Sequence, residues 1–339
     1  MAAPAGGERN HRAPGPGSVT GLRRATQLDP LELEPSGPSV VAIGGGHGLA
    51  TVLEALLGYA SEVTGIVTVA DDGGSSGRLT TTLAIPPPGD VRKCLLALSP
   101  EPSIFGELFG YRFEKTDVAG HSLGNLVLAA LTDLLGDFTT AIRTAEVMLG
   151  SLGQVIPVAP HSLHLRGVID GRVVDGQEAI NATRGRVESL SLLPADVAAE
   201  PEALEAVAEA DQIIIGPGSL YTSVISALMV SGMAEAVDAA RGNVIFVMNL
   251  VTQDAESLGL SGRQHVEELH RLTGLSRRGT VLLHQGSLEV PAQVERVVIE
   301  EPEAAAVGWG LAFADLADPS AEWPQHHPIR LGQALSRLV

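Results

Sequence analysis

Short apolar runs alternate along this chain with segments of helical spacing, and several of these runs end in glycine, aspartate or asparagine. The first run, residues 39–43, is β-branched, and three glycines and then a helical pattern of leucine and valine follow it. The same order returns after residues 63–69, 212–215 and 243–248. Strands that alternate with helices favour a mainly parallel sheet covered by helices on both faces. We therefore expect a doubly wound α/β fold.

Further elements follow from the same periodicity. We expect strands over residues 280–283 and 294–299, and helices over residues 123–135, 224–230 and 264–272.

One stretch departs from this alternation. Residues 154–192 contain short, partly alternating segments separated by Gly or Asp, which is typical of a small β-rich insertion. Residues 1–38 are rich in Ala, Pro, Gly and Arg without periodicity, and we interpret them as a disordered tail. We therefore predict one ligand-binding domain over residues 39–320 and a C-terminal extension over residues 321–339.

The charge balance limits the partners. Lys and Arg number 22 against 40 Asp and Glu, a net charge of −18, which repels nucleic acid. No uninterrupted apolar run reaches the roughly 18 residues that span a bilayer, so we expect no membrane insertion. The one cysteine, Cys94, excludes an intrachain disulfide. These features predict a cytoplasmic protein.

The loops after the strands are the candidate site, because ligands of open parallel sheets bind outside the carboxyl ends of the strands. We call residues 44–48 the first glycine loop; it consists of Gly44, Gly45, Gly46, His47 and Gly48. Its glycines let backbone N–H groups approach a phosphate. No Lys-Ser/Thr pair follows, and Leu49 fills the place of the third glycine of G-x-G-x-x-G. A tight turn without a ligand stays an alternative.

The second strand ends in an acidic loop. Asp71 and Asp72 are adjacent, and Ser75, Ser76 and Arg78 follow them. Neighbouring carboxylates repel each other without a counter-ion, so Asp71 and Asp72 are candidate ligands of Mg²⁺. A carboxylate at this place in a dinucleotide-binding unit also accepts from ribose hydroxyls. A solvated acidic turn is the remaining interpretation.

Four further regions carry candidate side chains. Asp90 stands where a helix begins and is expected to cap it. We call residues 216–219 the second glycine loop, and its small residues and N–H groups suit a phosphate. The binding candidates in these regions are Asp90, Asn125, Gly216, Gly218, Ser219, Tyr221, Thr222 and Asn249.

Five motifs in fixed order resemble the YvcK family of gluconeogenesis factors, which is related to CofD, the 2-phospho-L-lactate transferase. They are IGGGHGL at 43–49, TVADDGGSSGRL at 68–79, PPGD at 87–90, HSLGN at 121–125 and GPGSLYTS at 216–223. The resemblance extends over residues 40–309. It implies a Rossmann-like, three-layer α/β/α fold and a UDP-sugar ligand such as UDP-N-acetylglucosamine. It further implies a role in cell shape and envelope synthesis during gluconeogenic growth.

The resemblance also bears on cofactor and partners. CofD relatives hold a metal and the acceptor with acidic residues at the second-strand loop, which is where Asp71 and Asp72 stand. We expect a homodimer and partners among envelope-synthesis proteins.

Three functions remain open. The leading hypothesis is a regulatory protein that binds a nucleotide sugar without turnover, since no nucleophile motif is present. The second is a Mg²⁺-dependent transferase that moves a phosphoryl-bearing group from a nucleotide diphosphate donor, with Asp71 and Asp72 as catalytic candidates. The third, ranked lowest, is an NAD-linked oxidoreductase.

Overall fold

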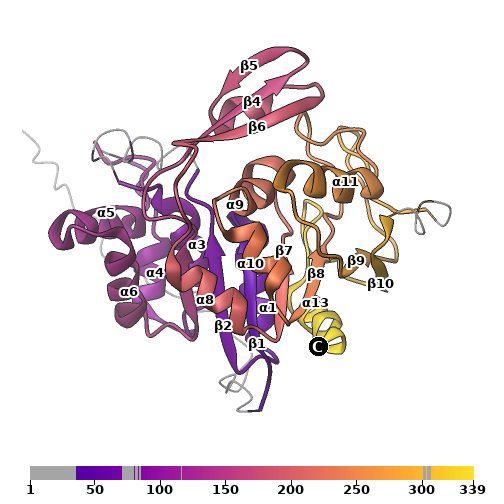
Figure 1. The fold of residues 1–339 in the computed structure, drawn as a ribbon. Coiled ribbons are helices and arrows are strands. Elements are labelled where there is room, and N and C mark those ends of the chain that lie inside the picture. The colour runs from indigo at the N-terminus through magenta and orange to yellow at the C-terminus, as the bar shows by residue number, and fades with distance from the viewer. Residues whose placement is uncertain are drawn as a thin grey trace, which may run out of the picture. The chain divides into compact units, whose positions relative to one another are not determined.

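The computed structural model describes residues 36–70, 80, 83, 85–115, 117–300, 303 and 307–339, and these residues form one compact unit (Figure 1). The acidic loop with Asp71, Asp72, Ser75, Ser76 and Arg78 lies outside the described residues. The expected tail over residues 1–38 falls almost entirely outside them as well.

A seven-stranded, fully parallel sheet forms the centre of the described unit, in the order β10-β9-β8-β7-β1-β2-β3. The strands are β1 (Ser39–Gly44), β2 (Glu62–Val67), β3 (Gln154–Pro157), β7 (Gln212–Ile215), β8 (Asn243–Val247), β9 (Thr280–His284) and β10 (Gly310–Ala314). β7 is buried throughout, and β1 from its second residue on, which explains the apolar runs at residues 213–215 and 40–43.

Helices cover both faces of this sheet, so the expected three-layer α/β/α fold is confirmed. They are α1 (Gly46–Leu56), α3 (Pro88–Ala97), α4 (Ile104–Gly110), α5 (Leu123–Leu135), α6 (Phe138–Leu149), α8 (Pro201–Glu209), α9 (Ser226–Leu228), α10 (Met233–Ala239), α11 (Gly262–Thr273) and α13 (Pro328–Leu335), with a π-helical turn η1 (Leu220–Ile225) and a 3₁₀ turn η2 (Ser336–Leu338). α1 packs against α3 and α13. α8 packs against α10, and Figure 1 shows both of these helices in front of the strands. None of the described helices has the length and apolarity needed to cross a membrane.

Local sequence sets where α5 ends and where α6 begins. α5 ends at Gly136, whose φ of 74° is the left-handed conformation that glycine adopts most easily. The next residue, Asp137, begins α6, because its carboxylate accepts the N–H of Thr140 at 2.6 Å.

A small antiparallel sheet stands apart from the parallel one. β4 (His164–Ile169) pairs with β5 (Arg172–Asp175) on one side and β6 (Val187–Leu193) on the other. The helix α7 (Gln177–Ala182) lies between β5 and β6 in the chain. Figure 1 shows this sheet at one end of the unit.

Two expectations about strands are corrected. β3, expected within the β-rich insertion, instead extends the parallel sheet beside β2, since its last three residues are buried like those of the central strands. Residues 294–299 are not a strand. Their backbone pairs elsewhere: Val298 O accepts the N–H of Gly262 at the start of α11, and Arg296 makes an isolated bridge with Val251. The last strand of the sheet in chain order is β10, which forms one edge, while β3 forms the other.

Candidate functional site

The two glycine loops meet where the strand order changes direction. From β1 the chain adds β2 and β3 on one side, and from β7 it adds β8, β9 and β10 on the other. Such a switch point places two strand-end loops on either side of a crevice. The pairing of β1 with β7 continues up to these loops, because Gly216 N–H, at the start of the second loop, donates to Ile43 O in β1 at 3.0 Å.

Close approach between the loops requires glycine at Gly48. A Cβ there would lie 2.2 Å from Pro217 O and 2.7 Å from Pro217 C, and both are backbone atoms. Gly46 differs, because it has a φ of 66° and a Cβ at this position would meet nothing within 4 Å. The tight-turn interpretation therefore accounts for Gly46, whereas Gly48 serves the contact between the loops.

Asp90 positions the first glycine loop. Its Oδ2 accepts Gly46 N–H at 2.7 Å, and its Oδ1 accepts from Lys93 Nζ at 2.9 Å. The expectation that Asp90 caps its own helix is wrong: α3 already begins at Pro88, and its N-cap is Pro87 without a side-chain bond. With Gly46 engaged, His47 and Gly48 are the other first-turn residues of α1 whose N–H groups have no acceptor four residues earlier within the helix. Partial burial and Lys93 lower the pKa of His47.

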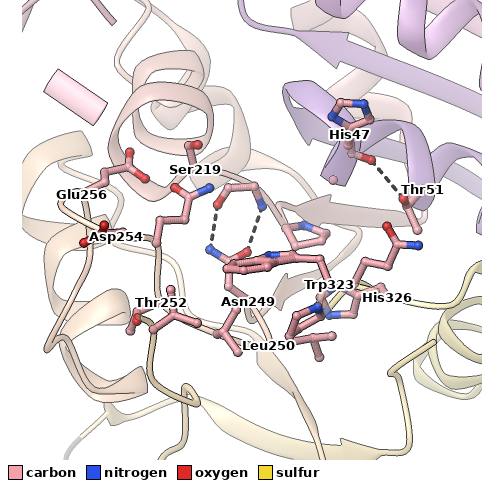
Figure 2. Close-up of a pocket in the computed structure, with 18 of the residues that line it drawn as sticks. His47, Thr51, Ser219, Asn249, Leu250, Thr252, Asp254, Glu256, Trp323 and His326 are labelled. Atoms are coloured by element: carbon pink, nitrogen blue, oxygen red, sulfur yellow. Dashed lines mark hydrogen bonds between the residues drawn. The ribbon is translucent and has the colours of Figure 1, made fainter. Parts of the chain in front are cut away.

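Asn249 holds the second glycine loop. Its amide Nδ2 donates to Gly218 O at 2.8 Å, and its Oδ1 accepts Gly218 N–H at 3.0 Å. Both ends of one residue's backbone are thus fixed by a single side chain at the end of β8, as Figure 2 shows. Asn249 acts on the shape of the loop.

The N-terminus of η1 is occupied by a side chain of this protein. Glu256 Oε1 accepts the N–H of Tyr221 at 3.0 Å and that of Thr222 at 3.1 Å. We expected Tyr221 and Thr222 to serve a phosphate, but in this structure their N–H groups hold a carboxylate instead. A helix start with free N–H groups favours an anion, and Glu256 supplies it.

The second carboxylate oxygen of Glu256 is buried and has no hydrogen-bond partner among the described residues. Burial raises the pKa of Glu256 to about 7, although the hydrogen bonds from Thr222 and Tyr221 oppose this rise. Burial thus makes the Glu256 carboxyl keep its proton to higher pH than an exposed glutamate does.

A cavity of about 680 Å³ opens at these strand ends (Figure 2). Five of the predicted residues line it, namely His47, Gly48, Gly218, Ser219 and Asn249. Gly44, Gly45, Gly46 and Gly216 belong to the loops behind that wall. Asn125 does not line the cavity; its Oδ1 accepts from Arg92 Nε at 3.0 Å between α5 and α3.

Sequence reasoning missed several residues of the wall. Asn181 comes from α7, and Trp323, Gln325 and His326 come from the segment expected to be a C-terminal extension. The other polar residues of the wall that were not among the binding candidates are Thr51, Thr252, Gln253, Asp254 and Glu256. One signal was present: Trp323 stands in a polar, proline-containing stretch, where an aromatic residue does not fit a core pattern.

A metal cluster is not evident in the part of the chain that the structure describes. No group of three or more His, Cys, Asp or Glu side chains there is placed to hold an ion. The magnesium candidates Asp71 and Asp72 are not among these residues, so their role stays a prediction.

Known proteins resemble this chain in sequence and in fold. A family model described as 2-phospho-L-lactate transferase CofD matches residues 40–307. The gluconeogenesis factor of Bacillus subtilis is 41% identical over 261 residues, which cover 76% of this chain and 82% of that protein. The gluconeogenesis factor of Halalkalibacterium halodurans is 38% identical, with 80% and 87% covered. A crystal structure of a Bacillus halodurans protein superposes with a TM-score of 0.85 at 35% identity, covering 88% of this chain and 99% of the other. The resemblance indicated by the five motifs is confirmed.

Proposed function

Because this chain belongs to the gluconeogenesis factor group of the CofD family, we propose that it is a regulatory protein that binds a nucleotide sugar such as UDP-N-acetylglucosamine without turning it over. The observation that carries the proposal is the pair of glycine loops that meet at the switch point between β1 and β7 and form one wall of the cavity.

The cavity suits a ligand of this class in size and chemistry. Its volume of about 680 Å³ falls within the range of roughly 300–1,000 Å³ of small-molecule sites. The N–H groups of His47 and Gly48 at the start of α1 favour a diphosphate, and the side chains of Thr51, Ser219 and Asn181 offer partners for hydroxyl groups. Magnesium held by Asp71 and Asp72 would neutralise part of the diphosphate charge.

The proposal of binding without turnover takes support from where the possible nucleophiles of the chain lie. Cys94, the one cysteine of the chain, is fully buried in α3 outside the cavity, and burial raises the pKa of its thiol well above the usual value. Neither a cysteine nor a lysine lines the described cavity wall.

Calorimetric titration with UDP-N-acetylglucosamine, with and without Mg²⁺, tests the proposal. We expect saturable binding of UDP-N-acetylglucosamine, and NAD in the same experiment should bind more weakly. No heat at millimolar UDP-sugar under either condition would contradict the proposal. For the cellular role, a strain that lacks the gene should lose its normal shape on a gluconeogenic carbon source and recover it with the intact gene.

A second function is favoured by the CofD match over residues 40–307. A phosphoryl-bearing group would pass from a nucleoside diphosphate carrier to an acceptor hydroxyl: a new P–O bond forms to the acceptor, the P–O bond to the nucleoside monophosphate breaks, and the hydroxyl proton passes to solvent. Incubation of donor nucleotides with cell extract should then release nucleoside monophosphate. Release that persists in the Asp71→Asn, Asp72→Asn double variant would exclude those two carboxylates from the step.

A further inference from the structure

A large aromatic side chain lies half exposed in the wall of the cavity. Trp323 is 46% exposed, whereas Trp309, the second tryptophan of the chain, is 5% exposed and donates from its Nε1 to His270 Nε2 at 2.8 Å. In the view of Figure 2, Trp323 overlaps Asn249, and the α1 residues His47 and Thr51 lie above and to the right. All four residues line the same cavity.

The loop that carries Trp323 is closed by backbone hydrogen bonds. Asp318 N–H donates to Gln325 O at 2.9 Å, and His327 N–H donates to Leu316 O at 2.8 Å. Ala317 and His326 form an antiparallel bridge between these two bonds. The ends of the loop are therefore held together, which fixes the direction from which the indole reaches the cavity.

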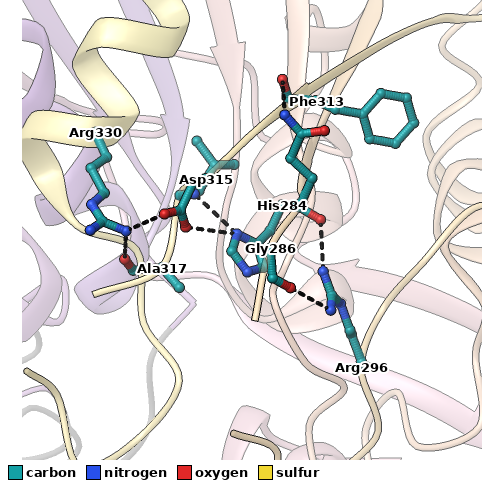
Figure 3. Close-up of polar contacts among 9 residues, drawn as sticks. His284, Gly286, Arg296, Phe313, Asp315, Ala317 and Arg330 are labelled. Atoms are coloured by element: carbon teal, nitrogen blue, oxygen red, sulfur yellow. Dashed lines mark hydrogen bonds and ion pairs between the residues drawn. The ribbon is translucent and has the colours of Figure 1, made fainter. Parts of the chain in front are cut away.

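Buried and charged side chains fix the base of this loop to the rest of the protein (Figure 3). His284, at the end of β9, accepts Leu316 N–H on its Nδ1 at 3.0 Å. Arg330, on α13, donates to Asp315 Oδ2 at 2.6 Å and to Ala317 O at 3.0 Å. The indole thus stands on a prearranged support, so a ligand that contacts it orders little additional chain.

We propose that the indole of Trp323 stacks on the nucleobase of the ligand. The inference rests on the proposed function and adds the contact that holds the base. An indole offers a wide planar apolar face, and stacking of a base on an aromatic ring stabilises binding whatever the base. The diphosphate meets the N–H groups of α1, while the base meets the segment between β10 and α13.

The proposed stacking predicts which ligands need Trp323 for tight binding and which do not. Ligands with a base, such as UDP and UDP-N-acetylglucosamine, depend on Trp323. N-acetylglucosamine 1-phosphate has no base and does not depend on it. Because every base has a stacking face, GDP should depend on Trp323 as UDP does.

Tryptophan fluorescence tests the contact directly, with excitation chosen to avoid tyrosine. UDP-N-acetylglucosamine should quench the wild-type protein and the Trp309→Phe variant, in which Trp323 alone emits. It should leave the Trp323→Phe variant, in which Trp309 alone emits, unchanged. Equal quenching of both variants would overturn the proposal.

Calorimetry gives the energetic test. Trp323→Ala should weaken binding of UDP by at least about fivefold, Trp323→Phe should weaken it less, and N-acetylglucosamine 1-phosphate should bind all variants alike. If the wild type binds no UDP-sugar, the proposed function fails. If it binds and Trp323→Ala binds equally well, the function stands and the stacking contact is wrong; a change in oligomeric state with unchanged affinity would also overturn the contact and assign the indole to an interface. Thermal unfolding checks that the variants fold.

Discussion

At the scale of single residues, the site is built from polar side chains that hold backbone. Asp90 takes an N–H of the first glycine loop, Asn249 clamps Gly218, and Glu256 takes the N–H groups at the start of η1. These side chains shape the cavity. The N–H groups of His47 and Gly48 at the start of α1 are not used by them and lie beside the cavity.

Glu256 should make stability fall as the pH rises. In the folded protein the carboxyl of Glu256 has a pKa of about 7, whereas in the unfolded chain we expect its usual pKa of 4.5. The folded state therefore holds the proton more strongly. The contribution is complete below about pH 4.5 and is lost by about pH 7, and it amounts to roughly 3 kcal/mol. Urea unfolding of the wild type and of Glu256→Gln at a series of pH values measures the difference, and the variant should lack this part of the slope.

Glu267→Gln is the matched control, since Glu267 is an exposed carboxylate paired with Arg263 at 2.6 Å. It should keep the wild-type slope. Equal slopes for Glu256→Gln and the wild type would show that Glu256 does not titrate between these values.

Gly48→Ala should disturb the contact between the glycine loops. The new Cβ would overlap the Pro217 carbonyl, so we expect a loss of roughly 1–3 kcal/mol in the free energy of unfolding and weaker ligand binding. Gly58→Ala, just beyond the other end of α1, is the control, because its Cβ would meet only Ala55 O at an ordinary 3.4 Å. Chemical denaturation should separate the two variants; similar values for both would contradict the loop contact.

Part of the candidate site was predicted from the sequence. The glycines of the first loop and His47 were predicted because they directly follow a β-branched run that forms a strand. The sequence marked Trp323 as unusual, but it could not place Trp323 or Asn181 in the cavity, because their positions depend on the return of the segment after β10 and on the position of α7. Neither is set by local sequence.

At the scale of elements, periodicity predicted the regular helices well. α5 was expected over residues 123–135 and is found there, because leucines recur at helical spacing and Gly136 ends it. η1 was not expected. Its start is held by Glu256, which is 34 residues from Thr222 in the chain, so a tertiary contact decides its geometry.

Asn249 connects two elements, β8 and the loop before η1, and its amide tests that connection. Asn249→Asp replaces the donor to Gly218 O by an oxygen that repels it, and we expect a loss of roughly 1–3 kcal/mol in unfolding free energy together with weaker ligand binding. Asn243→Asp makes the same chemical change at the exposed start of β8 and should leave both quantities nearly unchanged. Denaturation and calorimetry of the pair measure this, and a silent Asn249→Asp would refute the clamp.

At the scale of the whole described unit, α13 ties the end of the described chain to its beginning. Gln212, buried in β7, accepts the Tyr59 hydroxyl at 2.5 Å and donates to Leu335 O at 3.1 Å. Gly332 lies against α1, where a Cβ would be 2.5 Å from Ala55 O. The helix that begins in the first glycine loop is thus supported by the segment that also carries Trp323.

Gly332→Ala should weaken that support. We expect the free energy of unfolding to fall by roughly 1–3 kcal/mol, whereas Gln333→Ala, at an exposed neighbouring position, should change it by less than about 0.5 kcal/mol. Thermal or urea unfolding compares them. Unchanged stability of Gly332→Ala would show that α13 is not packed closely on α1.

The support by α13 also has a consequence for the order of synthesis. A ribosome makes the first glycine loop early and reaches Trp323 and α13 only after nearly all of the described chain. The wall that holds Trp323 and the helix that supports α1 are therefore the last parts of the described chain to be made. On the proposed binding mode, the cavity is complete only after translation has passed residue 335, and tight binding is expected of the complete molecule.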